Sequence, residues 1–397
     1  MSITKNQISE CEDDKLKIAE SLIPTLRERA AKGDLMKRLP DETYEDLRLS
    51  GLARTLQPKS FGGDELGFVE LIDRLTAIGR GDASTGWVLG QYCIHAYMTA
   101  FLPEEGQNEV WGEDPECFIV GVLAFPAGNA KKTNGGYILN GRWPFASGID
   151  GAKWCIFGAN LEDSNSQLVP WLFHVPINQV QQINNWETSG LRGTGSKDVS
   201  LENIFVPESR SLPVELTKGG NAPGLHLNNA PIYKTPMFGC FGFVQGSATL
   251  GGAQATIQIF VEKMKKRTTT SSGARLSEFM TLQSKISEAQ AAIDAAETIL
   301  KTDAIRIMQI AKNNEISDIE TSLKLRRNAA YAAKLAVNGV DLIISAAGGS
   351  ALYDKNPLSR SFRDAHACLA HITMNWEANG IPAGRHALGL DPNSDLI

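Results

Sequence analysis

A glycine-rich segment at residues 190–197, Gly-Leu-Arg-Gly-Thr-Gly-Ser-Lys, has a spacing that resembles a phosphate-binding loop. A P-loop needs Lys followed by Ser or Thr and a helix behind it, whereas here Ser196 precedes Lys197 and an expected strand follows at 199–206. No GxGxxG pattern follows a strand, so a Rossmann site for a nicotinamide cofactor is not expected either. Any redox cofactor must therefore be held in another way.

The residue pattern also disfavours hydrolysis by a nucleophilic triad or a metal ion. There is no GxSxG elbow, and the cysteines are scattered with no CxxC pair. His366 and His371 lie five apart on one expected helix, too far round it to share a metal ion, so we expect no metal site. We expect six cysteines to be small core residues in a reducing compartment: Cys11, Cys93, Cys117, Cys155, Cys240 and Cys368.

Composition indicates an ordinary globular chain. It has 397 residues, enough for two or three domains, with 42% hydrophobic and 21% charged residues. The net charge of -6 and the lack of a basic run predict no nucleic-acid partner. The apolar stretch 332–349 is broken by Asn338, Asp341 and glycines, which favours a buried helix over a membrane span. The polar, acidic start is unlike a signal peptide, so we expect a cytoplasmic protein without a membrane partner.

Hydrophobic periodicity divides the chain into three expected domains: helical at 1–114, a β-sheet or barrel at 115–217, and a four-helix bundle at 218–397. In the first, we expect a helix capped by Asp41 and ended by Gly51. In the second, short apolar runs predict antiparallel strands with a hairpin turn at 134–136. In the third, long helices are expected at 236–266, 279–300, 316–347 and 360–387, the first rich in small residues that allow close helix contact.

Several motifs, in the same order along the chain, resemble those of the acyl-CoA dehydrogenase superfamily. They are Gly348-Gly-Ser-Ala-Leu-Tyr353 followed by Arg363-Asp-Ala365, the helix that begins Phe279-Met-Thr-Leu-Gln283, and Trp186-Glu-Thr-Ser-Gly190-Leu-Arg-Gly-Thr-Gly-Ser196. The resemblance covers nearly the entire chain. It implies an α+β fold of the acyl-CoA dehydrogenase type, with an N-terminal helical domain, a central antiparallel β domain and a C-terminal four-helix bundle.

One position departs from the dehydrogenases. In that family a glutamate just after Arg-Asp-Ala removes the α-proton of the acyl thioester, but here the matching place reads Ala370-His371-Ile372-Thr373. The nearby carboxylate, Glu377, lies over one helical turn further on, too far to meet the same carbon. A histidine at this place is typical of the flavin-dependent monooxygenase branch. Its members use reduced flavin, FADH2 or FMNH2, supplied by a separate NAD(P)H-flavin reductase.

Two further segments resemble the hydroxylases of phenols and related aromatics. One is Gly136-Tyr-x-x-Asn-Gly141-Arg-Trp143-Pro-Phe145-Ala-Ser147-Gly148, and the other is Ser84-Thr-Gly-Trp87 with His95 eight residues later. The resemblance implies that reduced flavin and O2 form a C4a-hydroperoxide that hydroxylates a small aromatic substrate of phenol or indole type. It also implies a homotetramer. The alternatives are an acyl-CoA dehydrogenase or oxidase with a relocated base, an N- or S-oxygenating relative, and a non-catalytic flavin-binding protein.

The resemblance assigns roles to individual residues. Ser147 would bond flavin N5, and His371, or else His95, would be the base beside the substrate O–H or N–H. The residues expected to contact flavin are Trp87, Trp143, Phe145, Ala146, Ser147, Arg192, Gly193, Ser196 and Arg267, the last reaching a neighbouring subunit's pyrophosphate. Structural alternatives stay open, because Ser147 could be a turn residue and either histidine a core residue bonded to a backbone carbonyl.

Overall fold

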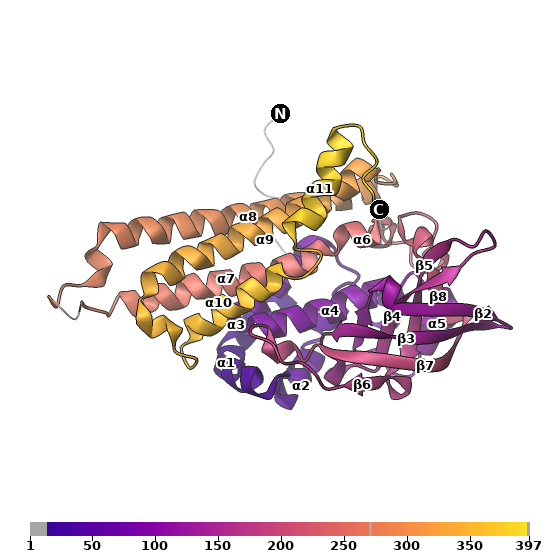
Figure 1. Ribbon diagram of the computed structural model, residues 1–397, viewed down its shortest axis with the longest axis horizontal. Coiled ribbons are helices and arrows are strands. Elements are labelled where there is room, and N and C mark those ends of the chain that lie inside the picture. The colour runs from indigo at the N-terminus through magenta and orange to yellow at the C-terminus, as the bar shows by residue number, and fades with distance from the viewer. Residues whose placement is uncertain (1–13, 270–271, 395–397) are drawn as a thin grey trace.

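The computed structural model describes residues 14–269 and 272–394, and it begins with a helical region (Figure 1). This region contains five α-helices: α1 Asp14–Met36, α2 Asp41–Ser50, α3 Phe68–Gly81, α4 Ala83–Thr99 and α5 Glu104–Trp111. Gly51 ends α2 in the left-handed conformation, as expected. The predicted cap of α2 is wrong, because Pro40 occupies the N-cap and Asp41 lies in the first turn, where its charge still favours the helix dipole. Cys11 lies outside the described residues.

The middle of the chain forms one eight-stranded sheet. Its strands are β1 Ile119–Val122, β2 Gly128–Thr133, β3 Gly136–Ala146, β4 Trp154–Glu162, β5 Leu168–Pro176, β6 Gln181–Ile183, β7 Lys197–Pro207 and β8 Ser211–Pro213. The order is β6-β7-β3-β2-β4-β5-β8, with β1 on β4. The expected hairpin turn joins β2 to β3, and Gly135 adopts φ 75° there.

The sheet is mainly antiparallel, as expected, and it contains two parallel pairings. β4 pairs in parallel with both β1 and β2, whereas the other pairs are antiparallel. β4 runs in the same direction as β2 because the connection at 147–153 is short, so β4 must begin at the end of the sheet where β3 stops. Ser147 lies at that end of the sheet, beside the helical region.

The last part of the chain is helical again: α6 Met237–Cys240, α7 Gly242–Met264, α8 Met280–Lys312, α9 Ile319–Ala347, α10 Pro357–Leu369 and α11 Trp376–Ala387. Helices α7 to α10 lie alongside one another as a bundle (Figure 1). The single helix expected at 360–387 is in fact two, because Asn375 caps a new helix by accepting from the Ala378 N–H. This break, at 370–375, contains His371.

Close contact between α3 and α7 joins the first helical region to the bundle. A Cβ on Gly251 of α7 would overlap the Thr76 carbonyl oxygen of α3, and a Cβ on Gly79 would lie 3.0 Å from the Ala248 oxygen. Backbones can approach this closely only where side chains are absent. The small-residue face expected on α7 is therefore confirmed as a helix contact, and α4 lies beside it against both α7 and β1.

One described helix, α9, is long and apolar enough to cross a membrane, but half of its most apolar window is buried inside the protein. The five described cysteines are also buried and unbridged, as expected of core residues. One continuous apolar core runs from α1 through the sheet to the bundle, so the three regions share their interior. The domain boundaries at 114 and 217 stay a prediction.

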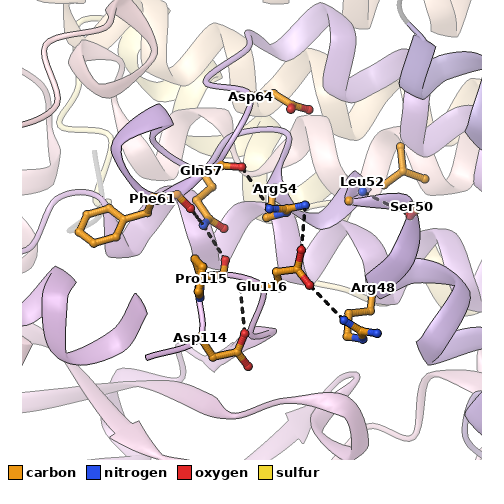
Figure 2. Close-up of polar contacts among 12 residues, drawn as sticks. Arg48, Ser50, Leu52, Arg54, Gln57, Phe61, Asp64, Asp114, Pro115 and Glu116 are labelled. Atoms are coloured by element: carbon orange, nitrogen blue, oxygen red, sulfur yellow. Dashed lines mark hydrogen bonds and ion pairs between the residues drawn. The ribbon is translucent and has the colours of Figure 1, made fainter. Parts of the chain in front are cut away.

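The segment between α5 and β1 is tied to the loop after α2 by polar contacts (Figure 2). The buried Gln57 amide donates to the carbonyl oxygens of Phe61 and Pro115, both at 2.8 Å. Beside it, the more exposed Glu116 forms ion pairs with Arg48 and Arg54 at 3.0 and 3.2 Å. The buried amide should stabilise this junction more than the ion pairs, since water screens exposed charges.

We expect Gln57→Ala to lower the free energy of unfolding by about 2–3 kcal/mol, because two carbonyl oxygens lose their donor. The matched control, Glu116→Gln, should lower it by less than about 1 kcal/mol. Urea denaturation followed by circular dichroism measures both. Equal losses in the two variants would contradict this ranking.

Candidate functional site

A chain of hydroxyl groups begins at Ser147, directly after β3, and crosses to the loop before β7. The Oγ atoms of Ser147 and Ser196 lie 2.7 Å apart, and Ser196 Oγ lies 2.6 Å from Thr194 Oγ1. Thr194 donates its only hydroxyl proton to the Leu191 carbonyl at 2.8 Å. Ser196 must therefore donate to Thr194, and Ser147 must donate to Ser196. The Trp87 indole N–H of α4 donates to Ser147 at 3.3 Å. Ser147 Oγ therefore keeps one free lone pair.

Unusual backbone conformations shape both segments. Phe145 has φ 68° and Leu191 has φ 50°, in the left-handed region that side chains other than glycine rarely adopt. A β-bulge between Trp143 and Ala146 accompanies the first, and the Gly148 N–H donates to Thr194 O at 2.9 Å. Such conformations persist only where the surroundings hold them, and they are frequent at functional sites.

His371 lies in the break after α10, with its ring edge-on to Trp87 at a centroid distance of 5.3 Å. The Thr373 N–H donates to His371 Nδ1 at 3.3 Å, and Thr373 Oγ1 lies 2.7 Å from the same atom. Because Nδ1 accepts, the neutral ring carries its proton on Nε2. Burial lowers the pKa of His371 to about 4, so the ring is neutral at physiological pH.

His95 lies two helical turns along α4 from Trp87 and has the opposite tautomer. Its Nδ1 lies 2.7 Å from the Gln91 carbonyl oxygen, which can only accept, so Nδ1 carries the proton and Nε2 keeps its lone pair. Burial lowers the pKa of His95 to about 4. A Cβ at Gly121 of β1 would overlap Nε2, and Phe241 lies edge-on at 6.5 Å. Nε2 of His95, the atom that can accept a proton, thus lies between Gly121 of β1 and the ring of Phe241.

The structure brings four of the sequence-predicted residues into direct contact: Trp87 with Ser147 and His371, and Ser147 with Ser196. Ala146 is fully buried beside Ser147. All four contacting side chains are uncharged, which suits a dry pocket that excludes ions. Within residues 14–269 and 272–394, no three His, Cys, Asp or Glu side chains converge on a possible metal site.

Two predicted aromatic contacts lie elsewhere. Trp143 is fully buried in the sheet core, where its indole N–H donates to Gly158 O at 2.7 Å and its ring packs edge-on against Phe157. Phe145 is 64% exposed and faces Trp186 across 6.2 Å. Regular strand alternation would place these two side chains on the same face, but the bulge between Trp143 and Ala146 turns Phe145 outward while Trp143 points into the core.

The predicted phosphate-binding residues make structural contacts within this chain. Arg192 donates to the carbonyl oxygens of Asp34 and Thr188, both at 3.1 Å, and Gly193 packs on Ser84. Arg267 donates to Ala347 O at the end of α9. Arg267 follows three residues after α7 ends at Met264, and that end of α7 is at the far end of the bundle from the sheet (Figure 1).

Sequence reasoning missed Thr373, Asn379 and Gly121, which position the two histidines. Asn379 is 2% exposed, and its amide donates to Ile372 O and Asn375 O at 2.8 Å. The His-x-Thr spacing at 371–373 was a visible local signal. The contact between Gly121 and His95 joins different elements, which no local pattern reveals, whereas the partners of Asn379 are only four and seven residues away.

Comparison with known proteins identifies close relatives. Residues 243–376 match the family model "Acyl-CoA dehydrogenase, C-terminal domain". The oxygenase component of an FADH(2)-dependent resorcinol hydroxylase from a Rhizobium species is 32% identical over 377 residues, covering 92% of each chain. The 3-HSA hydroxylase structure from a Rhodococcus species superposes with a TM-score of 0.92 at 30% identity, covering 97% of this chain and 99% of that one. XiaF from Streptomyces, in complex with FADH2 and glycerol, superposes with a TM-score of 0.89 at 28% identity, covering 96% of each chain.

We expect Asn379→Ala to lower the free energy of unfolding by about 2 kcal/mol, because the carbonyl oxygens of Ile372 and Asn375 lose their buried donor. Thermal denaturation monitored by circular dichroism measures the loss. The control Asn375→Asp keeps a good N-cap for α11 and should change stability little. If Asn379→Ala is as stable as the parent, the break at 370–375 is held in another way.

Proposed function

This chain belongs to the oxygenase components of two-component flavin-dependent monooxygenases, which have the acyl-CoA dehydrogenase fold, and we propose that it hydroxylates a small aromatic substrate of phenol or indole type. The observation that carries the proposal is the neutral cluster of Trp87, Ser147 and His371. A dehydrogenase needs a carboxylate where His371 lies, and Glu377 is exposed in the first turn of α11. That alternative is therefore not favoured.

The residues of the cluster fit a flavin ring. When bound, reduced flavin supplies the electrons that activate O2. Ser147 Oγ has one lone pair left, so it is able to accept from an N–H such as that at the N5 edge of reduced flavin. The Trp87 indole and the Ser196 hydroxyl hold Ser147 in place, and the buried surroundings keep water from that atom.

The two tautomers support different roles for the two histidines. His371 presents an Nε2–H, so it serves as a hydrogen-bond donor in the cluster. His95 presents a lone pair at Nε2, so it is the better candidate to take the proton from a substrate O–H or N–H, which reverses the order expected from sequence. Its low pKa does not prevent this, because the substrate anion formed would stabilise the imidazolium beside it.

The aromatic ring of the substrate would lie near His95, where Phe241 offers a ring for an edge-on contact. FADH2 and FMNH2 are both compatible with the contacts at Ser147 and Ser196. The resorcinol hydroxylase relative is named as an oxygenase component, which supports a separate NAD(P)H-flavin reductase as partner. We further propose a cytoplasmic homotetramer in which Arg267 reaches the flavin of a neighbouring subunit.

One experiment tests the function directly. Purified protein is mixed with chemically reduced FAD or FMN, O2 and one of a set of phenols and indoles, and products are identified by mass spectrometry. We expect a product heavier by one oxygen atom, with that atom derived from 18O-labelled O2. Formation of H2O2 alone with every phenol and indole, or oxidation of an acyl-CoA thioester instead, would contradict the proposal.

We expect His95→Asn to lower the hydroxylation rate about 100-fold or more, because the amide keeps a donor for Gln91 O but loses the basic lone pair. Relative to the parent at the same pH, the rate of this variant should rise as the pH approaches the pKa of a phenol substrate, since the substrate then arrives deprotonated. Stopped-flow or quenched-flow kinetics measure both effects. His371→Asn, in which the lost group is a donor, should show no such recovery; recovery in both variants would contradict the assignment.

We expect Ser147→Ala to divert reduced flavin from hydroxylation to H2O2, because the acceptor at the end of the hydroxyl chain is lost and water enters its place. The ratio of hydroxylated product to H2O2, measured per reduced flavin consumed, should fall several-fold. Ser200→Ala, on the exposed part of β7, is the control and should leave the ratio unchanged. A Ser147→Ala ratio equal to that of the control would remove Ser147 from the site.

A further inference from the structure

Two buried carboxyl groups line one small cavity where the segments that carry the proposed site converge. Asp82 precedes α4, Asp364 lies in α10, and both line a small cavity of about 30 Å³ between α3, α7 and α10. They are 8% and 3% exposed. Carboxylates are seldom buried this deeply unless they are paired with a cation or protonated, so the contacts of the two groups require an explanation.

Each carboxyl group holds one segment of the site. Asp82 Oδ2 accepts from the Thr85 N–H at 2.9 Å and from Thr85 Oγ1 at 2.6 Å, which caps the helix that carries Trp87 and His95. Asp364 Oδ1 accepts from the Leu191 N–H at 2.7 Å. Leu191 is the left-handed residue at the end of the hydroxyl chain, and α10 itself leads into His371.

We propose that Asp364 and Asp82 share a proton, and that loss of this proton loosens the contact between α4, α10 and the Leu191 loop, so that the enzyme uncouples in alkaline solution. The uncoupling part of this inference rests on the proposed function. The loosening part concerns the protein alone. Asp364 is in this respect a positioning residue, since it acts on the site through Leu191 and α10.

If both Asp82 and Asp364 were ionised, the positive groups around them would only partly offset the two negative charges. Arg360 lies one turn before Asp364 on α10, and α1 and α3 contribute Arg27 and Arg80 to the same cavity, although Arg80 is paired with Glu20. Opposing them is Asp34 of α1, which adds a negative charge and is itself paired with Arg363. On the remaining side, α7 contributes the uncharged Thr249, and α10 contributes the Cys368 thiol, whose pKa burial raises to about 12.

Burial, followed by the charge of Asp82, raises the pKa of Asp364 to about 7, and burial also raises that of Asp82. The folded protein therefore holds a proton that the unfolded chain releases near pH 4. This proton stabilises the fold fully in acid, and the stabilisation is lost as the pH rises from about 4 through about 7. At physiological pH a small change in acidity would change the charge of the pair.

The test compares the parent with Asp364→Asn, whose side-chain oxygen still accepts from Leu191 but cannot ionise. For the parent, the unfolding equilibrium constant should rise relative to that of the variant by roughly tenfold per pH unit between about pH 5 and 7. Denaturant titrations without flavin measure this. In turnover with reduced flavin, the ratio of product to H2O2 should fall above pH 7 in the parent and stay level in the variant.

A second variant keeps the test decisive if Asp364→Asn does not fold. Asp82→Asn retains an N-cap and removes the repelling charge, so the parent's inflection near pH 7 should move to lower pH and become smaller. Superimposable pH profiles of stability in the parent and in whichever variants fold would overturn the proposal. A parent that makes no hydroxylated product, yet shows the pH-dependent difference in stability, would contradict the proposed function while leaving the shared proton intact.

Discussion

A single run of hydrogen bonds joins the helical region, the sheet and the loop before β7. It passes from the Trp87 indole through Ser147, Ser196 and Thr194 to the Leu191 carbonyl, and its direction is set at the last step. Each of these buried hydroxyl groups would be costly to leave unpaired, so the run fixes the relative positions of the elements it connects. It also leaves one lone pair free on Ser147 Oγ, so this atom can accept a hydrogen bond but has no proton left to donate.

The backbone of the site depends on this run and on the contacts behind it. Phe145 and Leu191 hold left-handed conformations that their side chains disfavour, and each lies at one end of a segment fixed by hydrogen bonds. The Asp364 carboxyl group holds Leu191 by accepting from its backbone N–H, while the bulge in β3 turns Ser147 toward α4. Leu191 packs in a small apolar cluster with Trp87, Ala248 and Cys368, whereas Phe145 is exposed and its conformation is held by the hydrogen bonds that follow it.

Burial and local partners together define the two histidines. Both rings are desolvated and neutral, so their pKa values alone do not distinguish them. Their hydrogen-bond partners do, because the Gln91 carbonyl makes His95 a donor at Nδ1, whereas the Thr373 N–H makes His371 an acceptor there. Two residues of one type thereby present opposite functions to the same enzyme, a proton acceptor and a hydrogen-bond donor.

Local pattern was sufficient for the order of helical, β and helical regions, because the period of apolar residues changes where the structure changes. It was also sufficient for the hairpin at Gly135 and the helix end at Gly51, whose backbone conformations are set within a few residues. With the family resemblance, sequence also singled out Trp87, Ser147, Ser196 and His371 as site candidates, and the structure places them in contact. The break at 370–375 was missed although its signals are local, namely the N-cap Asn375 and the amide of Asn379, because the apolar period of the helix was followed across it.

Only tertiary structure decided which of the candidate residues meet. Trp143 and Ser147 lie four residues apart in one motif, yet the bulge sends one into the sheet core and the other to α4. The parallel pairing of β4 and the placement of Asp364 and Asp82 at one cavity likewise arise between distant segments. Sequence specified the residue types, their local conformations and, through partners two and four residues away, the tautomers of His371 and His95. Long-range packing set which side chains meet and how far they are desolvated, because these depend on atoms that are remote along the chain.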